Sequence, residues 1–519
     1  MIRNQCRREH AAGPSTDQPL IANQAACLHP LLYELNTRCW LRELSARHGL
    51  FIHLANVPEA EFTAWKRRGF THVWLMGCWT ICGRARETVL NDPALLELFD
   101  KALPDWSPDD VTGSPYAIAE YRVPESLGGE EGLREFRKRL HAHGLKLILD
   151  FVPNHTGLGH PWVKMQPELY VQGLPGSPET FVTESNAGMV WIAHGKDPFF
   201  PCWKDTAQLD YRRADTQSIM QQVLVGIAAR CDGVRCDLAM LVLRDVFEKT
   251  WAGPRMTSPA TDTEFWTEAI AAVKRESPEF LFLAEVYWDL EKNLQQLGFD
   301  YTYDKWLYDH LAYDNYAETQ NHLLELDLEF VRRSVHFLEN HDEQRAATRF
   351  SLAEHRGAAL LSFGLPGMRF LHDGQLEGAK IRLPVHLGRR PVEPPDPRIV
   401  GFYETLLTAL QSTAVGHGEC KILRPRSAWS QNSTDHCFVV VQWQSAPDAF
   451  DLVVVNLSAQ PSQCYVTPTI AGLGRREWKM EDLLGEEKYW RNGNEMLTRG
   501  LYLALPARGA QLFHFTPAK

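Results

Sequence analysis

Four apolar segments of this sequence each end in charged or imidazole side chains. The endings are DFVPNH (150–155), GVRCD (233–237), AEV (284–286) and ENHD (339–342). A single buried acid or histidine could be a structural ion pair or a hydrogen-bonded core residue, because burying such a group without a partner is costly. Four endings on one rim instead indicate a polar pocket. Two carboxyl groups in one pocket, one ionised and one protonated, are what cleavage of a glycosidic bond with retention requires.

Buried strands must carry these endings to a common rim. The sequence contains short runs rich in Val, Ile and Leu with little polar alternation, as expected for strands that are buried on both faces. The runs cover residues 31–41, 72–77, 146–152, 233–239, 280–286, 334–340 and 368–374, with a weaker one at 299–303.

Helix-like segments separate the runs. In residues 130–144, Leu133, Phe136 and Leu140 share one face, and residues 398–411 form a second such segment. Eight strands with intervening helices predict an α/β fold of the (β/α)8 TIM-barrel type, in which catalytic residues stand at the C-terminal ends of the strands. A doubly wound open sheet is the alternative. It would typically show a Gly-rich phosphate loop after its first strand, and the sequence has none there.

Composition divides the chain into further parts. The polar, aperiodic residues 1–29 are expected to form a flexible N-terminal arm, and residues 30–415 the barrel. After the third strand a segment rich in Pro, Gly and aromatic residues interrupts the barrel, and we expect it to form a small excursion domain over residues 156–215. From residue 418 the pattern changes to strands without helices, which predicts a C-terminal antiparallel β-sandwich over residues 418–519.

Bulk composition argues against several classes of function. The 519 residues carry a net charge of −11, whereas proteins that bind nucleic acids usually present a basic face. No apolar run is long enough to span a membrane, and the polar N-terminus lacks the apolar core of a secretion signal. The odd number of cysteines, 11, indicates free thiols rather than a disulfide framework. These features favour a cytoplasmic protein with no nucleic-acid or membrane partner, and they do not indicate an oligomeric state.

The four endings, in this order, resemble the four signature segments of glycoside hydrolase family 13, the α-amylase family. Three further segments are similar to parts of that family: LYELNTRCWL (32–41) to its first strand, SPYAIAEY (114–121) to the segment before its second helix, and QLDYR (208–212) to the segment before its fourth strand. The resemblance covers residues 30–415 and is expected to extend to the C-terminal sandwich. One short segment would be weak evidence, but four in order are specific.

The resemblance implies three catalytic carboxylates. Asp237 resembles the nucleophile of a retaining glycosidase, and Arg235, two residues earlier on the same strand, points to the same side and can keep it ionised. Glu285 resembles the acid/base, and its apolar neighbours would help raise its pKa so that it can protonate the leaving oxygen. Asp342 resembles the third carboxylate, which holds sugar hydroxyls and favours an oxocarbenium-like ring.

The same resemblance implies residues that bind substrate. His155 and His341 resemble the hydroxyl-binding imidazoles of the family. Tyr116 resembles the platform on which the sugar at the cleavage point stacks. Arg235 completes the expected set through its pairing with the nucleophile.

No cofactor is expected to be required. Cys78 and Cys82 form a CxxxC pair that no second pair or nearby His completes into a zinc site. The resemblance implies that Asn154 could bind a Ca²⁺ ion held by the excursion domain. Calcium needs several oxygen ligands, and no spacing in this sequence compels a site. The acids that could supply them are Asp197, Asp205 and Asp210.

Two features depart from an ordinary endo-acting α-amylase. In such enzymes a Lys-His pair after the nucleophile grips sugars on the leaving side, whereas here Met240 and Leu241 occupy those places and cannot make these hydrogen bonds. The basic loop after the last strand, residues 379–395, could bind a phosphate group, or its arginines could pair with acids of this acidic protein. The cations of this loop are Lys380, Arg382, Arg389 and Arg390.

The sequence therefore predicts a retaining glycosidase that acts on α-glucosidic bonds of α-glucans or oligosaccharides through a covalent glycosyl-Asp intermediate. A transglycosylase, or a transferase that passes glucosyl or maltosyl groups to phosphate, would use the same residues. A non-catalytic carbohydrate-binding relative is the third possibility. It would have lost at least one catalytic carboxylate, and all three are present.

Overall fold

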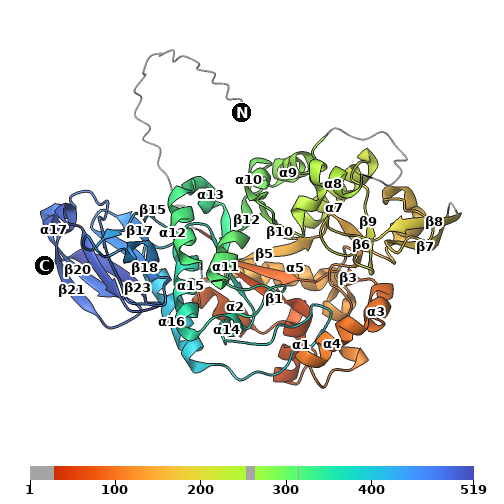
Figure 1. Ribbon diagram of the computed structural model, residues 1–519. Coiled ribbons are helices and arrows are strands. Elements are labelled where there is room, and N and C mark those ends of the chain that lie inside the picture. The colour runs from red at the N-terminus through yellow and green to blue at the C-terminus, as the bar shows by residue number, and fades with distance from the viewer. Residues whose placement is uncertain (1–28, 187, 253–262, 314, 519) are drawn as a thin grey trace, which may run out of the picture.

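The computed structural model of the protein describes residues 29–186, 188–252, 263–313 and 315–518 (Figure 1). The expected N-terminal arm lies outside the described residues except for His29. This residue is buried, and its backbone N–H donates to the carbonyl of Gly416 at 2.8 Å. Among the described helices, none is both long enough and apolar enough to cross a lipid bilayer.

Parallel strands form a closed barrel at the centre of the protein, as the sequence predicts. β1 closes the barrel because it pairs in parallel with both β2 and β14. The (β/α)8 prediction is thereby confirmed, each predicted run contributes one strand, and the open-sheet alternative is wrong. Within the described ranges the eight strands are β1 (Leu31–Asn36), β2 (His72–Met76), β5 (Lys146–Phe151), β10 (Gly233–Cys236), β11 (Leu281–Ala284), β12 (Tyr301–Tyr303), β13 (Ser334–His336) and β14 (Met368–His372).

The barrel strands are buried because their apolar side chains face the barrel interior on one side and helices on the other. β2 and β14, for example, are buried throughout. β1 is shorter than the predicted run of residues 31–41. Asn36 ends the strand, and its side chain accepts a hydrogen bond from the backbone of Cys39 at 3.2 Å. This N-cap starts helix α1 (Thr37–His48), so residues 37–41 are helical.

Helices cover the outside of the barrel (Figure 1). The two predicted helical segments are present as α5 (Gly129–Ala142) and α16 (Pro397–Ser412). The others are α2 (Glu59–Arg67), α3 (Gly83–Leu90), α4 (Pro93–Ala102), α7 (Ala214–Ala228), α8 (Arg244–Thr250), α9 (Phe265–Glu276), α10 (Glu291–Gln296), α11 (Lys305–Ala312), α12 (Tyr316–Glu325), α13 (Leu328–Arg332), α14 (Ala346–Arg349) and α15 (Leu352–Gly364).

Between β5 and α7 the chain makes a small excursion from the barrel. The excursion begins and ends beside the barrel mouth, because β6 and β9 pair antiparallel with His155 opposite Gln208. Figure 1 shows its β7–β8 hairpin at the end of the molecule that lies opposite the C-terminal domain. The elements of the excursion are β6 (His155–Gly157), α6 (Pro161–Met165), β7 (Thr180–Ser185), β8 (Gly188–Ala193) and β9 (Thr206–Gln208).

The C-terminal residues form antiparallel sheets, as predicted. Within residues 419–517, all of them described, a six-stranded and a three-stranded sheet share one apolar core, to which Val440 and Val454 contribute from the first sheet and Cys464 and Leu503 from the second. The first sheet contains β15 (Glu419–Leu423), β17 (Phe438–Ala446), β18 (Ala449–Asn456), β20 (Glu477–Asp482), β21 (Lys488–Asn492) and β23 (Ala510–Pro517). The second contains β16 (Arg426–Ser427), β19 (Ser462–Val466) and β22 (Leu501–Leu505).

Helix α15 joins the barrel to the C-terminal sheets. A Cβ atom at Gly364, the last residue of this helix, would lie 2.7 Å from the side chain of Val453 on β18. The indole of Trp443 on β17 donates a hydrogen bond to the carbonyl of Gly364 at 2.7 Å. The glycine therefore permits a close approach between helix and sheet that a larger residue would prevent.

Candidate active site

The C-terminal ends of β10 and β11 bring two of the predicted carboxylates onto one arginine. Arg235, which is 1% exposed, donates from Nη1 to Asp237 at 2.6 Å and from Nη2 to Glu285 at 2.7 Å. The two strands pair in register, with Cys236 opposite Ala284, so the residues that follow them leave the barrel side by side. The pairing with Asp237 is the one predicted from sequence. The second bond, to Glu285, fixes both carboxyl groups on one planar guanidinium.

Glu285 lies in surroundings that favour its protonated form. Burial raises the pKa of Glu285 to about 7, against the opposing charge of Arg235. Its carboxyl group is held by two further donors: the hydroxyl of Tyr287 to Oε1 at 2.7 Å, and the backbone N–H of Leu238 to Oε2 at 2.7 Å. A carboxyl group whose pKa lies near neutrality can both give and take a proton at physiological pH.

Asp237 is also buried, with 5% of its surface exposed. Burial raises the pKa of Asp237, and the charge and hydrogen bond of Arg235 oppose this effect without cancelling it. Because Asp237 and Glu285 share the same cation, they titrate as a coupled pair. When one of the two acids is protonated, the charge of Arg235 stabilises the ionised form of the other acid more strongly.

Leu238, directly after Asp237, has a left-handed backbone with φ 40° and ψ 50°. This conformation is uncommon and costly for a residue other than glycine. It turns the chain so that the N–H groups of Leu238 and Ala239 reach the carboxylate and the backbone carbonyl of Glu285, at 2.7 and 2.9 Å. The strained residue thus ties the end of β10 to the end of β11.

His341 connects the third predicted carboxylate to another strand end. Its Nδ1 lies 2.5 Å from Oε1 of Glu34, a fully buried acid on β1, and its Nε2 lies 3.1 Å from Oδ2 of Asp342. The hydroxyl of Tyr116 lies 2.7 Å from the same Nε2, and its ring stacks on the imidazole. Burial lowers the pKa of His341, but Asp342 and Glu34 outweigh it and hold the pKa well above its usual value. The two carboxylates thus favour the protonated form of this imidazole.

Asp342 lies on the solvent side of this group, since 47% of its side chain is exposed. Desolvation raises the pKa of Asp342, but the charge and hydrogen bond of His341 lower it more, and the net pKa lies below the usual range. A carboxylate that stays ionised and reaches solvent can accept hydrogen bonds from sugar hydroxyls.

His155, at the start of the excursion, is buried beside Tyr116. Burial lowers the pKa of His155 to about 4, while its hydrogen bond to the backbone of Tyr116 opposes the shift. The neutral ring can donate from one nitrogen and accept at the other. The guanidinium carbon of Arg235 lies 5.3 Å from the centroid of the Tyr116 ring, which closes the network.

All the residues predicted from sequence are thus connected at one end of the barrel. Sequence reasoning missed Glu34 and the donors to Glu285, namely Leu238 and Tyr287. Tyr287 had a local signal, because it follows Glu285 by two residues and therefore points to the same side of extended chain. Glu34 had none, since 307 residues separate it from His341.

Comparison with known proteins identifies the barrel. Residues 106–383, more than half of the chain, match the family described as alpha amylase, catalytic domain. The chain belongs to the α-amylase family. A crystal structure of a maltogenic α-amylase, AmyB from Thermotoga neapolitana, superposes with a TM-score of 0.66 at 18% identity and covers 94% of this chain and 99% of its own. At this identity the likeness shows the α-amylase fold.

Curated members of the α-amylase family are distant in sequence. The chain is 23% identical to Alpha-amylase 3 of Dictyoglomus thermophilum over 286 residues, 50% of this chain and 53% of that protein. It is 29% identical to Maltase 1 of Drosophila virilis over 153 residues, 25% of this chain and 24% of that protein. It is 27% identical to an alpha-1,4-glucan:maltose-1-phosphate maltosyltransferase of Bifidobacterium longum over 186 residues, 35% of this chain and 20% of that protein. The chain spans about half, or less, of the length of these relatives.

Two features set the sequence apart from an endo-acting α-amylase, the Met240–Leu241 pair and the basic loop of residues 379–395, and the structure describes both. Met240 and Leu241 lie in a short helical turn after Asp237 and are 0% and 3% exposed, so both side chains pack in the core. In the basic loop, Arg389 pairs with Asp105 at 3.1 Å and with Asp110 at 3.0 Å. Arg390 likewise pairs with Asp373 at 2.8 Å and with Glu43, while Arg382 is exposed.

Three of the four residues considered for calcium have partners within the protein. Arg212 donates from Nε and Nη2 to the two carboxylate oxygens of Asp210, each at 2.7 Å. Asn154 exchanges hydrogen bonds with the side-chain amide of Gln208 at 3.0 and 3.3 Å. Asp197 caps a turn by accepting from two backbone N–H groups. In the part of the chain that the structure describes, no group of three His, Cys, Asp or Glu side chains is placed to hold a metal ion. Oxygens of Asn154, Asp197 and Asp210 are thus engaged by donors of the protein itself.

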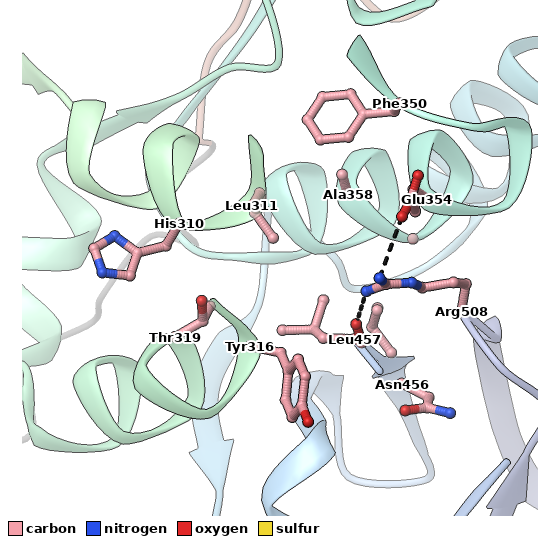
Figure 2. Close-up of a pocket in the computed structure, with 12 residues that line it drawn as sticks. His310, Leu311, Tyr316, Thr319, Phe350, Glu354, Ala358, Asn456, Leu457 and Arg508 are labelled. Atoms are coloured by element: carbon pink, nitrogen blue, oxygen red, sulfur yellow. Dashed lines mark hydrogen bonds and ion pairs between the residues drawn. The ribbon is translucent and has the colours of Figure 1, made fainter. Parts of the chain in front are cut away.

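Figure 2 shows a pocket between helices α11, α12 and α15 and the C-terminal domain. Arg508 forms an ion pair with Glu354 across this pocket at 3.2 Å, and Phe350 and Leu457 supply part of its apolar wall. The described residues that line it do not include the predicted site residues. The pocket belongs to the junction between the two domains.

Proposed function

We propose that this protein is a retaining glycosidase that cleaves α-glucosidic bonds of α-glucans or oligosaccharides through a covalent glycosyl-Asp237 intermediate. The observation that carries the proposal is the pairing of two carboxyl groups with a single buried arginine. Arg235 holds Asp237 and Glu285 in one buried pocket, and burial raises the pKa of Glu285 to about 7. Membership of the α-amylase family supports the same assignment.

In the first step, Glu285 gives its proton to the glycosidic oxygen as the bond between that oxygen and the anomeric carbon breaks. A carboxylate oxygen of Asp237 forms a bond to the same carbon, and the leaving sugar departs with a new hydroxyl group. Arg235 stays bonded to both acids, so it can follow the charge as Asp237 loses it and Glu285 gains it.

In the second step, Glu285 accepts a proton from water as the water oxygen attacks the anomeric carbon and Asp237 leaves. Two inversions return the α-configuration. Asp342 and the His341 cation are placed to hold the hydroxyls of the reacting sugar, and Tyr116 and His155 to hold its ring and remaining hydroxyls. No step needs a cofactor.

Transfer is the second candidate function, because a sugar hydroxyl or phosphate can replace water in the second step. Two observations favour keeping it. Met240 and Leu241 supply no polar groups on the leaving side, and relatives include maltose-1-phosphate maltosyltransferases, one of which is 27% identical over 292 residues. A non-catalytic carbohydrate-binding role is disfavoured because all three carboxylates are present and connected.

The test is to incubate the protein with maltooligosaccharides, sucrose, trehalose and glycogen, with and without inorganic phosphate, and to resolve the products with their anomeric form. We expect α-anomeric primary products from at least one α-glucoside. β-Anomeric primary products would contradict the retaining assignment. Phosphorylated products would show that the reaction is transfer to phosphate and not hydrolysis. An Asp237→Asn variant with full activity would exclude Asp237 as the nucleophile.

A further inference from the structure

A second cavity is bordered by the end of helix α2, by helix α16 and by the chain that follows β14. Its volume is about 350 Å³, which lies within the range of small-molecule binding sites. Arg67 and Arg68 line it from α2, Glu377 from the chain after β14, and Glu404 and Gln411 from α16. The described residues of this lining include none of those predicted for the active site.

The end of α2 holds the two arginines on a fixed turn. Gly69 ends the helix with φ 85°, a left-handed conformation that glycine adopts at little cost, and its N–H donates to the carbonyl of Lys66 at 3.0 Å. The side-chain amide of Gln411 donates to the carbonyl of Arg67 at 3.1 Å. A Cβ atom on Gly69 would lie 3.1 Å from the same Gln411 side chain, so the turn packs closely on α16.

The guanidinium groups of Arg67 and Arg68 are available to a ligand. Neither side chain forms an ion pair or a hydrogen bond with any other described residue. In the basic loop, by contrast, Arg389 and Arg390 are each paired with acids. Arg67 is exposed and Arg68 is half-buried. Two adjacent guanidinium groups present planar sets of N–H donors that match the oxygens of a phosphate group.

Two carboxyl groups line the same cavity. Glu404 is exposed on α16, whereas Glu377 is half-buried. Burial raises the pKa of Glu377, the charge of Asp373 adds to this effect, and the charge of Arg68 opposes it. Ionised carboxylates only accept hydrogen bonds, so a ligand that contacts them must bring donors such as hydroxyl groups. The apolar part of the lining comes from Leu376, Val400 and Leu407.

We propose that this cavity binds a phosphorylated sugar, with its phosphate group on Arg67 and Arg68 and its hydroxyl groups on Glu377 and Glu404. Such a ligand carries both an anion for the cations and hydroxyl donors for the carboxylates. Inorganic phosphate would meet only the arginines and would be repelled by the acids. An uncharged sugar would leave the arginines without an anion. The sugar phosphate is bound here and not transformed, so the site does not depend on the proposed function.

The lining of the cavity is bonded to the barrel mouth. Gln375, directly before Leu376, donates to the hydroxyl of Tyr403 at 2.7 Å, and Tyr403 itself lines the cavity. The side-chain oxygen of Gln375 accepts from the N–H of His372, the last residue of β14, at 3.3 Å. A bound ligand therefore contacts the segment that leaves β14. We expect it to slow amide hydrogen exchange in residues 375–378 and to raise the midpoint of thermal unfolding.

The test measures binding of glucose 6-phosphate by calorimetry, with inorganic phosphate and glucose as the two partial ligands. We expect glucose 6-phosphate to bind more tightly than either. Arg67→Ala and Arg68→Ala should each raise its Kd about tenfold, as for the loss of a charge-assisted hydrogen bond. Glu377→Gln should weaken glucose 6-phosphate while inorganic phosphate binds at least as well as before, because a repelling charge has been removed.

Arg84→Ala is the matched control, since Arg84 is exposed on α3, forms no ion pair with a described residue, and should change the Kd by less than about twofold. Thermal unfolding of each variant without ligand shows that it is folded. Absence of glucose 6-phosphate binding, or equal losses in Arg68→Ala and Arg84→Ala, would overturn the site. Inorganic phosphate binding as tightly as glucose 6-phosphate would overturn the sugar part, and displacement by maltotriose would move the ligand to the candidate active site. Because these measurements need no turnover, failure of the proposed function would appear separately, as a protein that cleaves no α-glucoside.

Discussion

At the scale of single residues, the site depends on how one cation is shared between two acids. The guanidinium of Arg235 holds Asp237 at 2.6 Å and Glu285 at 2.7 Å, so the charge of each acid affects the titration of the other. The proposed chemistry needs Asp237 ionised and Glu285 protonated at the start. Burial raises the pKa of Glu285 to about 7, which places its proton where it can be used.

We predict a rate that falls as pH rises through about 7. Above this pH Glu285 loses the proton that the first step needs, so kcat/KM for maltotriose should show its alkaline limb there. Glu285→Gln should lower kcat/KM for maltotriose by about 10²–10⁴-fold and remove that limb. The donor α-glucosyl fluoride needs no acid, so its first step should largely survive the substitution. An alkaline limb that persists in the variant would exclude Glu285 as its source.

A second prediction concerns Glu34, the buried partner of His341. Glu34→Gln replaces a charge with a neutral amide of similar size, so the pKa of His341 should fall towards its usual value. Loss of a charged hydrogen bond in this pocket should reduce kcat/KM by about 10- to 100-fold. The measurement is NMR titration of the His341 imidazole together with the kinetics. An unchanged imidazole titration would contradict the role given to Glu34.

At the scale of elements, the sequence predicted more of the barrel than of the site. Apolar runs located each barrel strand, and their polar ends located Asp237, Glu285 and Asp342, because the pattern of a buried parallel strand is local. The length of β1 was overestimated because Asn36 caps a helix inside an apolar run. Contacts between distant strands, such as Glu34 with His341, depend on barrel closure and leave no local signal.

The basic loop shows the same limit of sequence reasoning. Its arginines could be recognised as cations, but their partners could not. Arg389 pairs with Asp105 and Asp110, 284 and 279 residues away. These ion pairs hold the loop against the chain segment before Tyr116. They also neutralise the charge of Arg389, which could otherwise bind a phosphate group.

For the excursion, we predict that activity does not depend on calcium. Asp210 is engaged by Arg212, and Asn154 by Gln208, so these two residues already direct oxygens to donors of the protein itself. Dialysis against EGTA should leave both kcat/KM for maltotriose and the midpoint of thermal unfolding unchanged. Loss of activity that added Ca²⁺ restores would contradict this arrangement.

At the scale of the whole molecule, the barrel and the C-terminal domain are joined over a broad contact. Helix α15 packs on β18, and the indole of Trp443 donates to the end of that helix. Arg508, before β23, reaches back to Glu354 on α15 and donates to the carbonyl of Leu457 (Figure 2). The residues predicted for the active site are not among the described residues that line the pocket at this junction.

The junction can therefore be weakened without touching the site. Arg508→Ala removes the ion pair with Glu354 and the hydrogen bond to Leu457, and should lower the free energy of unfolding by about 1–3 kcal/mol. Denaturant titration measures this loss, and kcat/KM should stay unchanged. Arg499→Ala is the control, because its pair with Glu495 is exposed and should change stability by less than about 0.5 kcal/mol. Equal effects of the two substitutions would contradict a special role for Arg508.

The covalent intermediate on Asp237 is the central claim, and trapping it is the most direct test. A 5-fluoro-α-glucosyl fluoride reacts through its good leaving group, while the ring fluorine slows release of the trapped sugar. Digestion and mass spectrometry of the inactivated protein should find one 5-fluoroglucosyl group, on the peptide that contains Asp237. A label on another carboxylate, or no covalent adduct from a preparation that turns over maltotriose, would contradict the mechanism.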